Sequence, residues 1–544
     1  MGKTSCVFTR RSGDRDPPDF RRKQNCLEFN NQKNRGTTMK LNVTKFRLAL
    51  ILLATTAFCN PAIAGKADDT LNAAFTKEIA TLDTYKESTR EGLIVGRLIY
   101  DSLLSKDFKT GEFIPELAES YKVDSDTEIT FKIRKGVKFH NGDPLTADDI
   151  VFTLNLVSKP DFGAKYDIAV NWIKDAEKVD DDTVKLTMKS PNPLALEMLA
   201  GNLPIYSKAY YEKVGTNGMA VKPVGTGPYK VVAVTPGSSL TLERFDDYYK
   251  GGQKENPKIK NIVFRILPER NTQYTELMNG TLDWVWQVPK DDALKLENLQ
   301  NIKIDTAPIM RFEYIQMATN IAHSPLANQL VRKAIAHAIN RMEIRDAFQG
   351  NDAQIINSAC NPVQFGCETD VATYDYNPSK ARELLKEAGF EAGFTLNMVT
   401  SGGGSGVPEA VKADLEKVGI KLELHNFQYA AAVEQWRSGK LDLFYDDWGS
   451  YGVGDVGLSV ANFFKGTGDD VVKDPEVIPL LDKAGKIMDR DERKQLYSKA
   501  LKLIADKAYW VPLWVQNVKT ASSKDLALTV NPDEFVPFYD AEWK

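Results

Sequence analysis

The feature that most constrains the fold is an alternation of strand and helix signals between residues 394 and 424. Residues 394–399 (FTLNMV) and 420–424 (IKLEL) are short apolar and β-branched runs that are typical of strands. Between them lie a glycine-rich loop, SGGGSG at 401–406, and a helical pattern over 408–418. A strand, helix, strand order favours two parallel strands joined by a crossover. The sequence therefore predicts an α/β fold with a partly parallel sheet.

Similar signals place other elements along the chain. Strands are predicted at 130–134 (TFKIR), 184–188 (VKLTM) and 441–445 (LDLFY). Thr146 precedes two aspartates and predicts the N-cap of a helix over 147–158. Apolar residues at helical spacing predict one helix across 330–348 and another over 378–387, which closes on Gly389.

The segment PVGTGPY at 223–229 predicts a rigid tight turn. Gly225 and Gly227 allow backbone angles that are closed to other residues, and Pro228 fixes the exit. A nucleotide-binding loop would carry a Lys and a following helix with Ser or Thr at the phosphate-binding spacing, and the segment has neither. The turn is therefore interpreted as structural.

The pattern near the N-terminus predicts secretion. Lys40, Lys45 and Arg47 form a basic region, residues 48–58 an apolar run, and residues 62–64 (AIA) a small-residue cleavage site. An apolar run of eleven residues is too short to cross a bilayer, which takes about 20. We therefore expect residues 39–64 to be a signal peptide that is cleaved after Ala64. Residues 1–38 are polar and basic, and we interpret them as a non-native start or a disordered prefix.

Removing this region changes the charge of the protein. Residues 1–64 contain 12 Lys and Arg and 4 Asp and Glu, which leaves 58 basic and 70 acidic residues and a net charge of −12. An acidic protein is a poor candidate for binding nucleic acid or anionic lipid. Cys59 follows the bulky Phe58, which disfavours a lipoprotein and favours a soluble exported product.

Two cysteines remain after cleavage, Cys360 and Cys367 in the segment CNPVQFGC. In an exported protein they are best interpreted as one local disulfide. The alternative is a metal pair, but no His lies nearby, and the four His of the chain are scattered. We therefore expect no metal and no cofactor.

Six collinear segments resemble one known family, the extracellular solute-binding proteins of the peptide/nickel type, family 5. They are residues 117–154 (LAESYKVDSDTEITFKIRKGVKFHNGDPLTADDIVFTL), 223–230 (PVGTGPYK), 242–252 (LERFDDYYKGG), 330–341 (LVRKAIAHAINR), 374–390 (YDYNPSKARELLKEAGF) and 510–514 (WVPLW). The resemblance spans nearly all of the chain after residue 64. It implies a bilobed periplasmic-binding-protein-like fold of the class II type, with an extra domain inserted in the first lobe. By this resemblance the first lobe joins 65–97, 215–306 and 515–544, the inserted domain is 98–214, and the second lobe is 307–514.

The residues after the strand at 441–445 are the strongest candidates for ligand contact. The segment YDDWGSYGVGD, residues 445–455, would be presented at a strand end, where α/β folds bind ligands. Trp448 beside Gly449 offers a flat apolar face for stacking. In peptide-binding relatives an acidic residue shortly after this Trp anchors the ligand's free amine. Here Ser450 or Tyr451 stands at that position, while the acids are Asp446, Asp447 and Asp455. Asp446 and Asp447 could also merely cap or solvate a turn.

Other candidates come from separate segments, as a cleft requires. Phe75 and Glu78 belong to a segment that resembles the family's loop bordering the pocket. Trp284 and Trp286 lie two apart on one face of a predicted strand, and core packing is the alternative for one of them. Thr400, Ser401 and Tyr429 follow predicted strands and could supply polar contacts.

The resemblance implies a binding protein of an ABC importer and not an enzyme. We expect a periplasmic monomer that captures an oligopeptide or peptide-like solute by lobe closure and delivers it to the permease subunits in the inner membrane. A non-peptide solute such as an opine, sugar conjugate, haem or metal chelate is an alternative. A secreted hydrolase is a weaker one, since the chain has neither G-x-S-x-G nor H-E-x-x-H.

Overall fold

The computed structural model describes residues 65–321, 324–401 and 406–544. The predicted prefix, the signal peptide and its cleavage site lie outside the described residues, as do four residues of the SGGGSG loop. Within the described part, no helix combines the length and the apolar character that are needed to cross a membrane.

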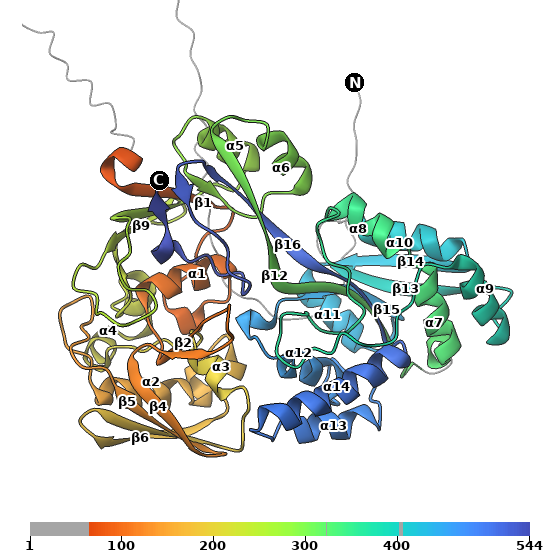
Figure 1. The fold of residues 1–544 in the computed structure, drawn as a ribbon, viewed down its shortest axis with the longest axis horizontal. Helices are drawn as coiled ribbons and strands as arrows, with labels where there is room; N and C mark the ends of the chain where they lie inside the picture. The colour runs from red at the N-terminus through yellow and green to blue at the C-terminus, as the bar shows by residue number, and fades with distance from the viewer. Residues whose placement is uncertain (1–64, 322–323, 402–405) are drawn as a thin grey trace, which may run out of the picture. The chain divides into compact units, whose positions relative to one another are not determined.

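A ten-stranded mixed sheet organises the fold (Figure 1). Its strand order is β14, β13, β15, β12, β16, β11, β1, β10, β9, β8. In that order the strands are Ile420–Phe427, Phe394–Ser401, Leu443–Trp448, Ile302–Met317, Trp510–Ser523, Trp284–Val285, Thr70–Phe75, Asn261–Ile266, Ser239–Arg244 and Tyr229–Thr235. β13 runs parallel to both β14 and β15, which confirms the partly parallel sheet predicted from the sequence.

Two long antiparallel strands connect the two halves of this sheet. β12 and β16 pair from Ile302 opposite Ser523 to Gln316 opposite Trp510, with irregular register between Pro308 and Tyr314. β12 then pairs with β15, while β16 pairs with β11. The irregular stretch of β12 therefore lies where the sheet passes from one half to the other.

Smaller sheets and helices complete the fold. A four-stranded antiparallel sheet has the order β4 (Ala118–Ser125), β5 (Glu128–Ile133), β7 (Thr183–Met188) and β6 (Ile173–Asp180). Two further sheets have two antiparallel strands each, β2 (Leu104–Lys106) with β3 (Phe113–Pro115) and β17 (Leu526–Ala527) with β18 (Glu542–Trp543). The α-helices are α1 Arg90–Ile99, α2 Ala147–Val157, α3 Ala195–Leu199, α4 Lys208–Val221, α5 Arg270–Met278, α6 Lys290–Leu296, α7 Gln329–Ala338, α8 Arg341–Phe348, α9 Pro378–Glu387, α10 Val407–Glu416, α11 Tyr429–Arg437, α12 Gly457–Phe464, α13 Val477–Ala484 and α14 Arg490–Asp506.

Local sequence signals explain several of these boundaries. Thr146 and Asp149 form a reciprocal capping box at the start of α2, as the hydroxyl and carboxylate pattern predicted. The prediction of one helix across 330–348 was wrong, because the helix ends at Ala338 and a new one begins at Arg341. Asn340 causes the restart, since its side chain accepts a hydrogen bond from the backbone N–H of Glu343.

The predicted turn at 223–229 is a bend over residues 226–228 that leads into β8 at Tyr229, and the reason given for its glycines was wrong. Neither Gly225 nor Gly227 has a positive φ. Each instead packs against the C-terminal end of α1, where a Cβ on Gly225 would clash with the carbonyl oxygen of Ile99 and one on Gly227 with that of Leu98. The glycines therefore allow close approach between the turn and α1.

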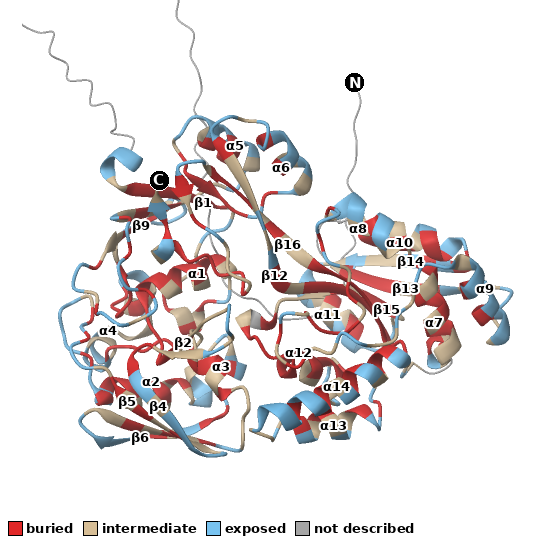
Figure 2. Cartoon of the chain, viewed as in Figure 1, coloured by how far each residue is buried: buried red, intermediate tan, exposed pale blue. Residues whose placement is uncertain are grey.

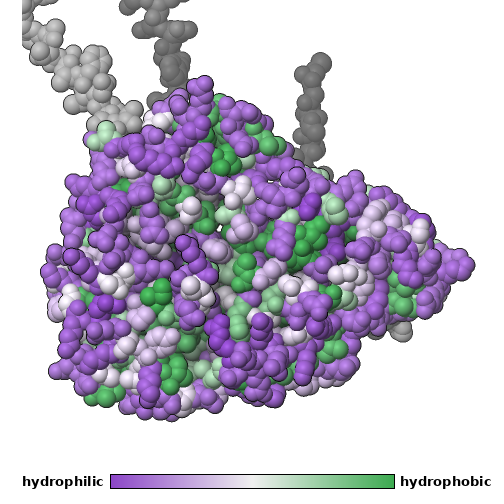
Figure 3. All heavy atoms as spheres, viewed as in Figure 1, coloured by the Kyte–Doolittle hydropathy of each residue, from purple (hydrophilic) through white to green (hydrophobic). Residues whose placement is uncertain are grey.

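The central strands form the core of the described residues. Figure 2 shows β12, β13, β15 and β16 largely buried, while exposed residues gather on helices such as α9, α13 and α14. The face shown in Figure 3 is mostly hydrophilic, with apolar side chains in small separate groups. Such scattered apolar groups are ordinary for a protein surface.

Candidate functional site

The segment that the sequence singled out is partly strand. Asp446, Asp447 and Trp448 belong to β15 and pair in register with β12, so the prediction that the loop starts at Tyr445 was wrong. The loop begins at Gly449 and contains a short 3-10 turn over Ser450–Gly452. Because strand residues alternate between faces, Asp447 points to the opposite face of the sheet from Asp446 and Trp448.

Trp448 lies at the junction of two hydrophobic cores. Its half-buried indole packs against the largest core cluster, which contains β1 and α1, and also against the cluster around Trp510. The ring of Phe463 meets it edge-on, with a centroid distance of 5.1 Å. Trp448 therefore touches both halves of the described fold.

An ionic network surrounds the start of this loop. Arg311 on β12 forms ion pairs with Asp447 and with Glu534, the latter at 2.9 Å from Nε to Oε1. Glu534 also pairs with Arg90 of α1 at 3.2 Å. A Cβ on Gly449 would lie 2.8 Å from Nη2 of Arg311, so a larger residue there would press on the guanidinium. The network thus joins β12, β15, α1 and the C-terminal segment.

The network is reflected in the ionisation of its members. Burial opposes the charge of Arg311, but Asp447 and Glu534 outweigh it and raise the pKa of the guanidinium. Burial, reinforced by the neighbouring Asp447, raises the pKa of Asp446 well above its ordinary value. Asp447 is the partner of Arg311, whereas Asp446 is buried beside it without an ion pair among those found in the described residues.

The predicted disulfide between Cys360 and Cys367 is confirmed, with a Cα–Cα distance of 5.7 Å. The loop that it closes supports the loop after β15. Gln364 Nε2 donates to Ser450 Oγ and to the carbonyl oxygen of Val453, both at 2.9 Å. Phe365 exchanges backbone hydrogen bonds with Gly454 and Val456. The disulfide loop therefore fixes the position of the candidate ligand loop.

Asp455 is held in a buried ion pair. Its Oδ2 lies 3.0 Å from Nη2 of Arg493, and the two side chains are 2% and 4% exposed. Its Oδ1 accepts a hydrogen bond of 2.8 Å from the backbone N–H of Gly457. Both oxygens are therefore used within the protein, where they fix the loop to α12 and α14.

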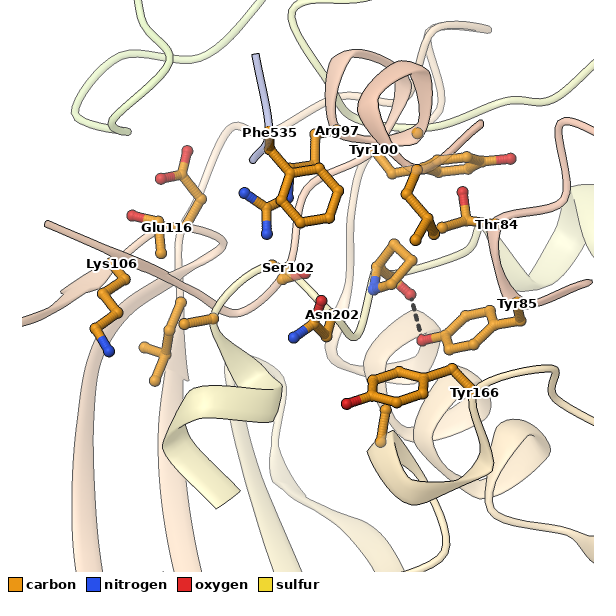
Figure 4. Close-up of a pocket in the computed structure, with 18 of the residues that line it drawn as sticks. Thr84, Tyr85, Arg97, Tyr100, Ser102, Lys106, Glu116, Tyr166, Asn202 and Phe535 are labelled. Atoms are coloured by element: carbon orange, nitrogen blue, oxygen red, sulfur yellow. Dashed lines mark hydrogen bonds between the residues drawn. The ribbon is translucent and has the colours of Figure 1, made fainter. Parts of the chain in front are cut away.

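A cavity of about 200 Å³ lies next to the other side of this loop. Its walls come from α1, from residues 84–88, 102–108, 165–169 and 200–204, and from the C-terminal residues Phe535 and Tyr539. Figure 4 shows Arg97 and Phe535 together, Lys106 and Glu116 on one side, and Thr84, Tyr85 and Tyr166 on the other. The guanidinium of Arg97 lies 3.5 Å from the centroid of Phe535.

The loop meets this cavity at its cationic side. A Cβ on Gly452 would lie 3.1 Å from the ring of Phe535 and 3.6 Å from Arg97 Nη2. Gly454 lies against Lys106, and its backbone N–H donates to Glu197 Oε2 at 3.0 Å. Lys106 in turn pairs with Glu197 at 2.5 Å, and Arg97 pairs with Asp533 at 2.5 Å. The loop after Trp448 therefore lies against side chains that line the cavity, although none of residues 449–455 lines it.

Several sequence-derived candidates lie elsewhere. Phe75 is in the core, stacked on Phe264 at 4.9 Å, and the indole of Trp284 meets Phe538 in the same core. Glu78 is exposed and accepts a hydrogen bond from the backbone N–H of Gly237. These three side chains do not line the cavity beside the loop.

The remaining candidates are spread over two regions. Trp286 lines a second cavity, of about 310 Å³, together with Arg311 and Glu534. Thr400 is buried and Ser401 half-buried at the end of β13, while Tyr429 is exposed at the start of α11. None of these three lines either cavity.

Sequence reasoning missed the side chains that line the 200 Å³ cavity. They come from segments spread along the chain from Thr84 to Tyr539. No spacing links Arg97 to its partner Asp533, which lies 436 positions away. The one signal was the aromatic and acidic composition of residues 533–540 (DEFVPFYD). This segment supplies Phe535 and Tyr539 to the cavity and Asp533 as the partner of Arg97. Within the described residues there is no group of three or more His, Cys, Asp and Glu that could hold a metal ion.

Comparison with known proteins gives a consistent result. The family described as bacterial extracellular solute-binding proteins, family 5 Middle, matches residues 112–470. The glutathione-binding protein GsiB of Pectobacterium atrosepticum is 30% identical over 485 residues, which cover 85% of this chain and 92% of that protein.

Solved structures agree with this match. The periplasmic binding protein DppA from Helicobacter pylori, in complex with the peptide STSA, is 25% identical with a TM-score of 0.70, covering 87% of this chain and 99% of that chain. The PBP AgaA from A. tumefacien R10, in complex with agropinic acid, is 26% identical with the same TM-score and coverage. The fold is thus the mixed α/β fold of periplasmic binding proteins, and the family binds substrates without transforming them. This chain belongs to the bacterial extracellular solute-binding proteins of family 5.

Proposed function

We propose that this protein is the periplasmic binding component of an ABC importer for an oligopeptide or peptide-like solute. It binds the solute and delivers it to permease subunits in the inner membrane. The observation that carries the proposal is the cavity beside the loop after Trp448, within a chain of this family. The relatives named for glutathione and the neighbour solved with a peptide support this ligand class.

The proposal includes the route and the movement of the protein. Residues 39–64 direct export and are removed after Ala64, and the exported chain acts as a monomer. One lobe comprises 65–97, 215–306 and 515–544, with 98–214 inserted, and the other comprises 307–514. The lobes close on the ligand, which removes water and aligns polar groups with it. Gly449, Ser450 and Tyr451 contact the ligand on the side of the second lobe.

The volume of the cavity limits what it can hold. An apolar cavity of about 150 Å³ accommodates one benzene molecule, and the cavity here measures about 200 Å³. It therefore holds one residue or one end of a peptide, and the rest of the ligand lies against the loop after β15.

Calorimetric titration with glutathione and with a set of di- and tripeptides tests the proposal. We expect saturable 1:1 binding of at least one of them, with a change in tryptophan fluorescence that is reduced in Trp448→Phe. The absence of binding to every peptide and conjugate would refute the ligand class.

A non-peptide conjugate such as an opine is the second candidate. The neighbour solved with agropinic acid and the lack of an acidic residue directly after Trp448 favour it. Native mass spectrometry of protein purified from its own periplasm distinguishes the two, since the mass of a retained ligand identifies its class.

A further inference from the structure

The second cavity, of about 310 Å³, is lined by charged side chains that already have partners. These side chains are Lys290, Arg311, Lys519 and Glu534. Arg311 and Glu534 pair with each other, and Lys519 pairs with Asp352 at 3.0 Å. Lys290 donates to two backbone carbonyl oxygens near the end of α8. Among the described residues, no charged group at the wall of this cavity is therefore left for a ligand.

Two glutamines at the wall share one partner behind it. Gln349, directly after α8, and Gln516, on β16, both line the cavity. Their Nε2 atoms donate to the same oxygen of Glu313 on β12, Oε1, at 2.8 and 2.9 Å. Glu313 is 3% exposed and does not line the cavity itself. Its other oxygen, Oε2, accepts a hydrogen bond of 2.5 Å from the hydroxyl of Tyr445.

The carboxylate of Glu313 fixes the orientation of both carboxamides. A carboxylate can only accept hydrogen bonds, so each glutamine must turn its NH2 group toward Glu313 and its oxygen away from it. Neither glutamine Oε1 atom has a donor among the described residues. Neither belongs to the buried polar atoms that lack a partner, so both oxygens keep accessible surface. Glu313 thus gives the wall of the cavity two hydrogen-bond acceptors of fixed orientation.

Two fixed acceptors select the chemical group that can bind beside them. A hydroxyl or a carboxamide donates to such oxygens and has no charge that must be desolvated. A carboxylate would bring only further acceptors, which would leave the oxygens on both sides without donors. An ammonium group would lose its water next to three cations, with no acidic side chain left to pair with it. The cavity therefore favours an uncharged group that donates hydrogen bonds.

We propose that Glu313 is a positioning residue that sets the ligand selectivity of this cavity through Gln349 and Gln516. The proposal rests on the proposed function and adds that a hydroxyl or carboxamide group of the solute binds here. Glu313 itself does not touch the solute. The place is suited to this role, because Arg311 lines the cavity and also lies against Gly449, the first residue of the loop that contacts the ligand in the proposed function.

Asparagine and aspartate distinguish a donor from an acceptor at nearly constant shape. Ala-Ala-Ala and its variants with Asn or Asp at each position are titrated calorimetrically against wild type, Glu313→Gln and the control Glu119→Gln, which changes an exposed glutamate of β4. We expect wild type and E119Q to prefer Asn over Asp at one position by about tenfold, as one or two hydrogen bonds provide.

In E313Q this preference should fall to about threefold or less, because the Asp peptide binds more tightly. The new carboxamide can donate to one of the two glutamine oxygens, which lets that side chain turn its NH2 group toward the cavity. General damage to the site would instead weaken the binding of both peptides. Equal weakening of both, with the preference unchanged, therefore overturns the proposal.

A second comparison separates orientation from the loss of a negative charge. E313Q is also made in the background Gln349→Leu/Gln516→Leu, or in each single variant if the double one does not fold. A change of preference that disappears in this background supports the proposal, because it shows that Glu313 acts through the carboxamides. A change that persists there is an effect of charge and overturns it.

The remaining outcomes separate this proposal from the proposed function. Peptide binding without a preference for Asn over Asp in wild type overturns the role of Glu313 and leaves the proposed function intact. Absence of binding by every tripeptide overturns this proposal, whereas the proposed function falls only if glutathione and the dipeptides also fail to bind. If E313Q does not fold, as judged by its melting curve, Gln349→Leu and Gln516→Leu take its place. A reduced preference in either variant supports the proposal, and an unchanged preference in both overturns it.

Discussion

His140 makes the stability of the protein depend on pH through a single ring. Its Nδ1 accepts a hydrogen bond from the backbone N–H of Gly225 at 3.3 Å, so Nε2 carries the proton and donates to the carbonyl oxygen of Gly227 at 2.9 Å. The neutral ring thereby links the segment around His140 to the turn at 223–229 through two hydrogen bonds. Protonation of Nδ1 would remove the acceptor for Gly225.

The size of the effect follows from the pKa. Burial lowers the pKa of His140 from 6.5 to about 4, although the carbonyl of Gly227 and Asp101 act in the opposite direction. Between these two values the folded state binds fewer protons than the unfolded state, so stability is full above pH 6.5 and decreases as the pH falls toward 4. A shift of this size corresponds to about 3 kcal/mol, at 1.36 kcal/mol per pH unit.

The variant His140→Gln isolates this contribution, because glutamine can donate and accept but does not titrate. Urea unfolding of wild type and H140Q, followed by fluorescence from pH 7 to pH 4, measures the difference in free energy of unfolding at each pH. We expect wild type to be the more stable at pH 7 and to lose about 3 kcal/mol relative to H140Q by pH 4. A difference that stays constant within about 0.5 kcal/mol over this range would refute the reasoning.

Three further predictions concern the supports of the site. Arg493→Met leaves the carboxylate of Asp455 buried without its cation and should lower the free energy of unfolding by about 3 to 5 kcal/mol, as measured by urea unfolding. A loss below about 1 kcal/mol would contradict this expectation. The double variant Cys360→Ser/Cys367→Ser should cost about 2 to 3 kcal/mol for so short a loop and should speed amide exchange at Phe365 and Val456. Unchanged protection of these two amides would argue against the coupling. Gly225→Ala should lower the free energy of unfolding by about 1 to 3 kcal/mol, because the added Cβ clashes with the end of α1. The control Gly468→Ala has open space around the added Cβ and should be nearly neutral. Equal melting points of the two variants would contradict the packing argument.

Local patterns in the sequence predicted much of the fold. The helix Pro378–Glu387 has the predicted bounds, and the strand, helix, strand unit at 394–424 is present with longer strands. Local periodicity failed where two elements share one apolar pattern. Leu330, Ile335, Ile339 and Ile344 fit one helix by spacing alone, yet the chain breaks at Asn340 because its side chain caps a second helix.

The site was less predictable because tertiary contacts create it. Trp448 was recognisable as an aromatic residue beside a glycine, but its position on β15 depends on pairing with Phe312, far away in the chain. The side chains that line the cavity carried no motif, since folding brings them together from distant segments. A property of that kind can be found only once all the neighbours of the side chain are known.

The loop after β15 makes more contacts on its own side than toward the cavity, and this difference bears on the affinity for a ligand. The loop after β15 is fixed on its own side by Gln364, Phe365 and the buried pair of Asp455 with Arg493. Toward the cavity, the backbone hydrogen bond found among the described residues is the one from Gly454 to Glu197. A loop with this distribution of contacts keeps its shape whether or not it touches the cavity wall. Its conformational entropy is therefore lost on folding and not on ligand binding, so a larger share of the contact energy remains as affinity.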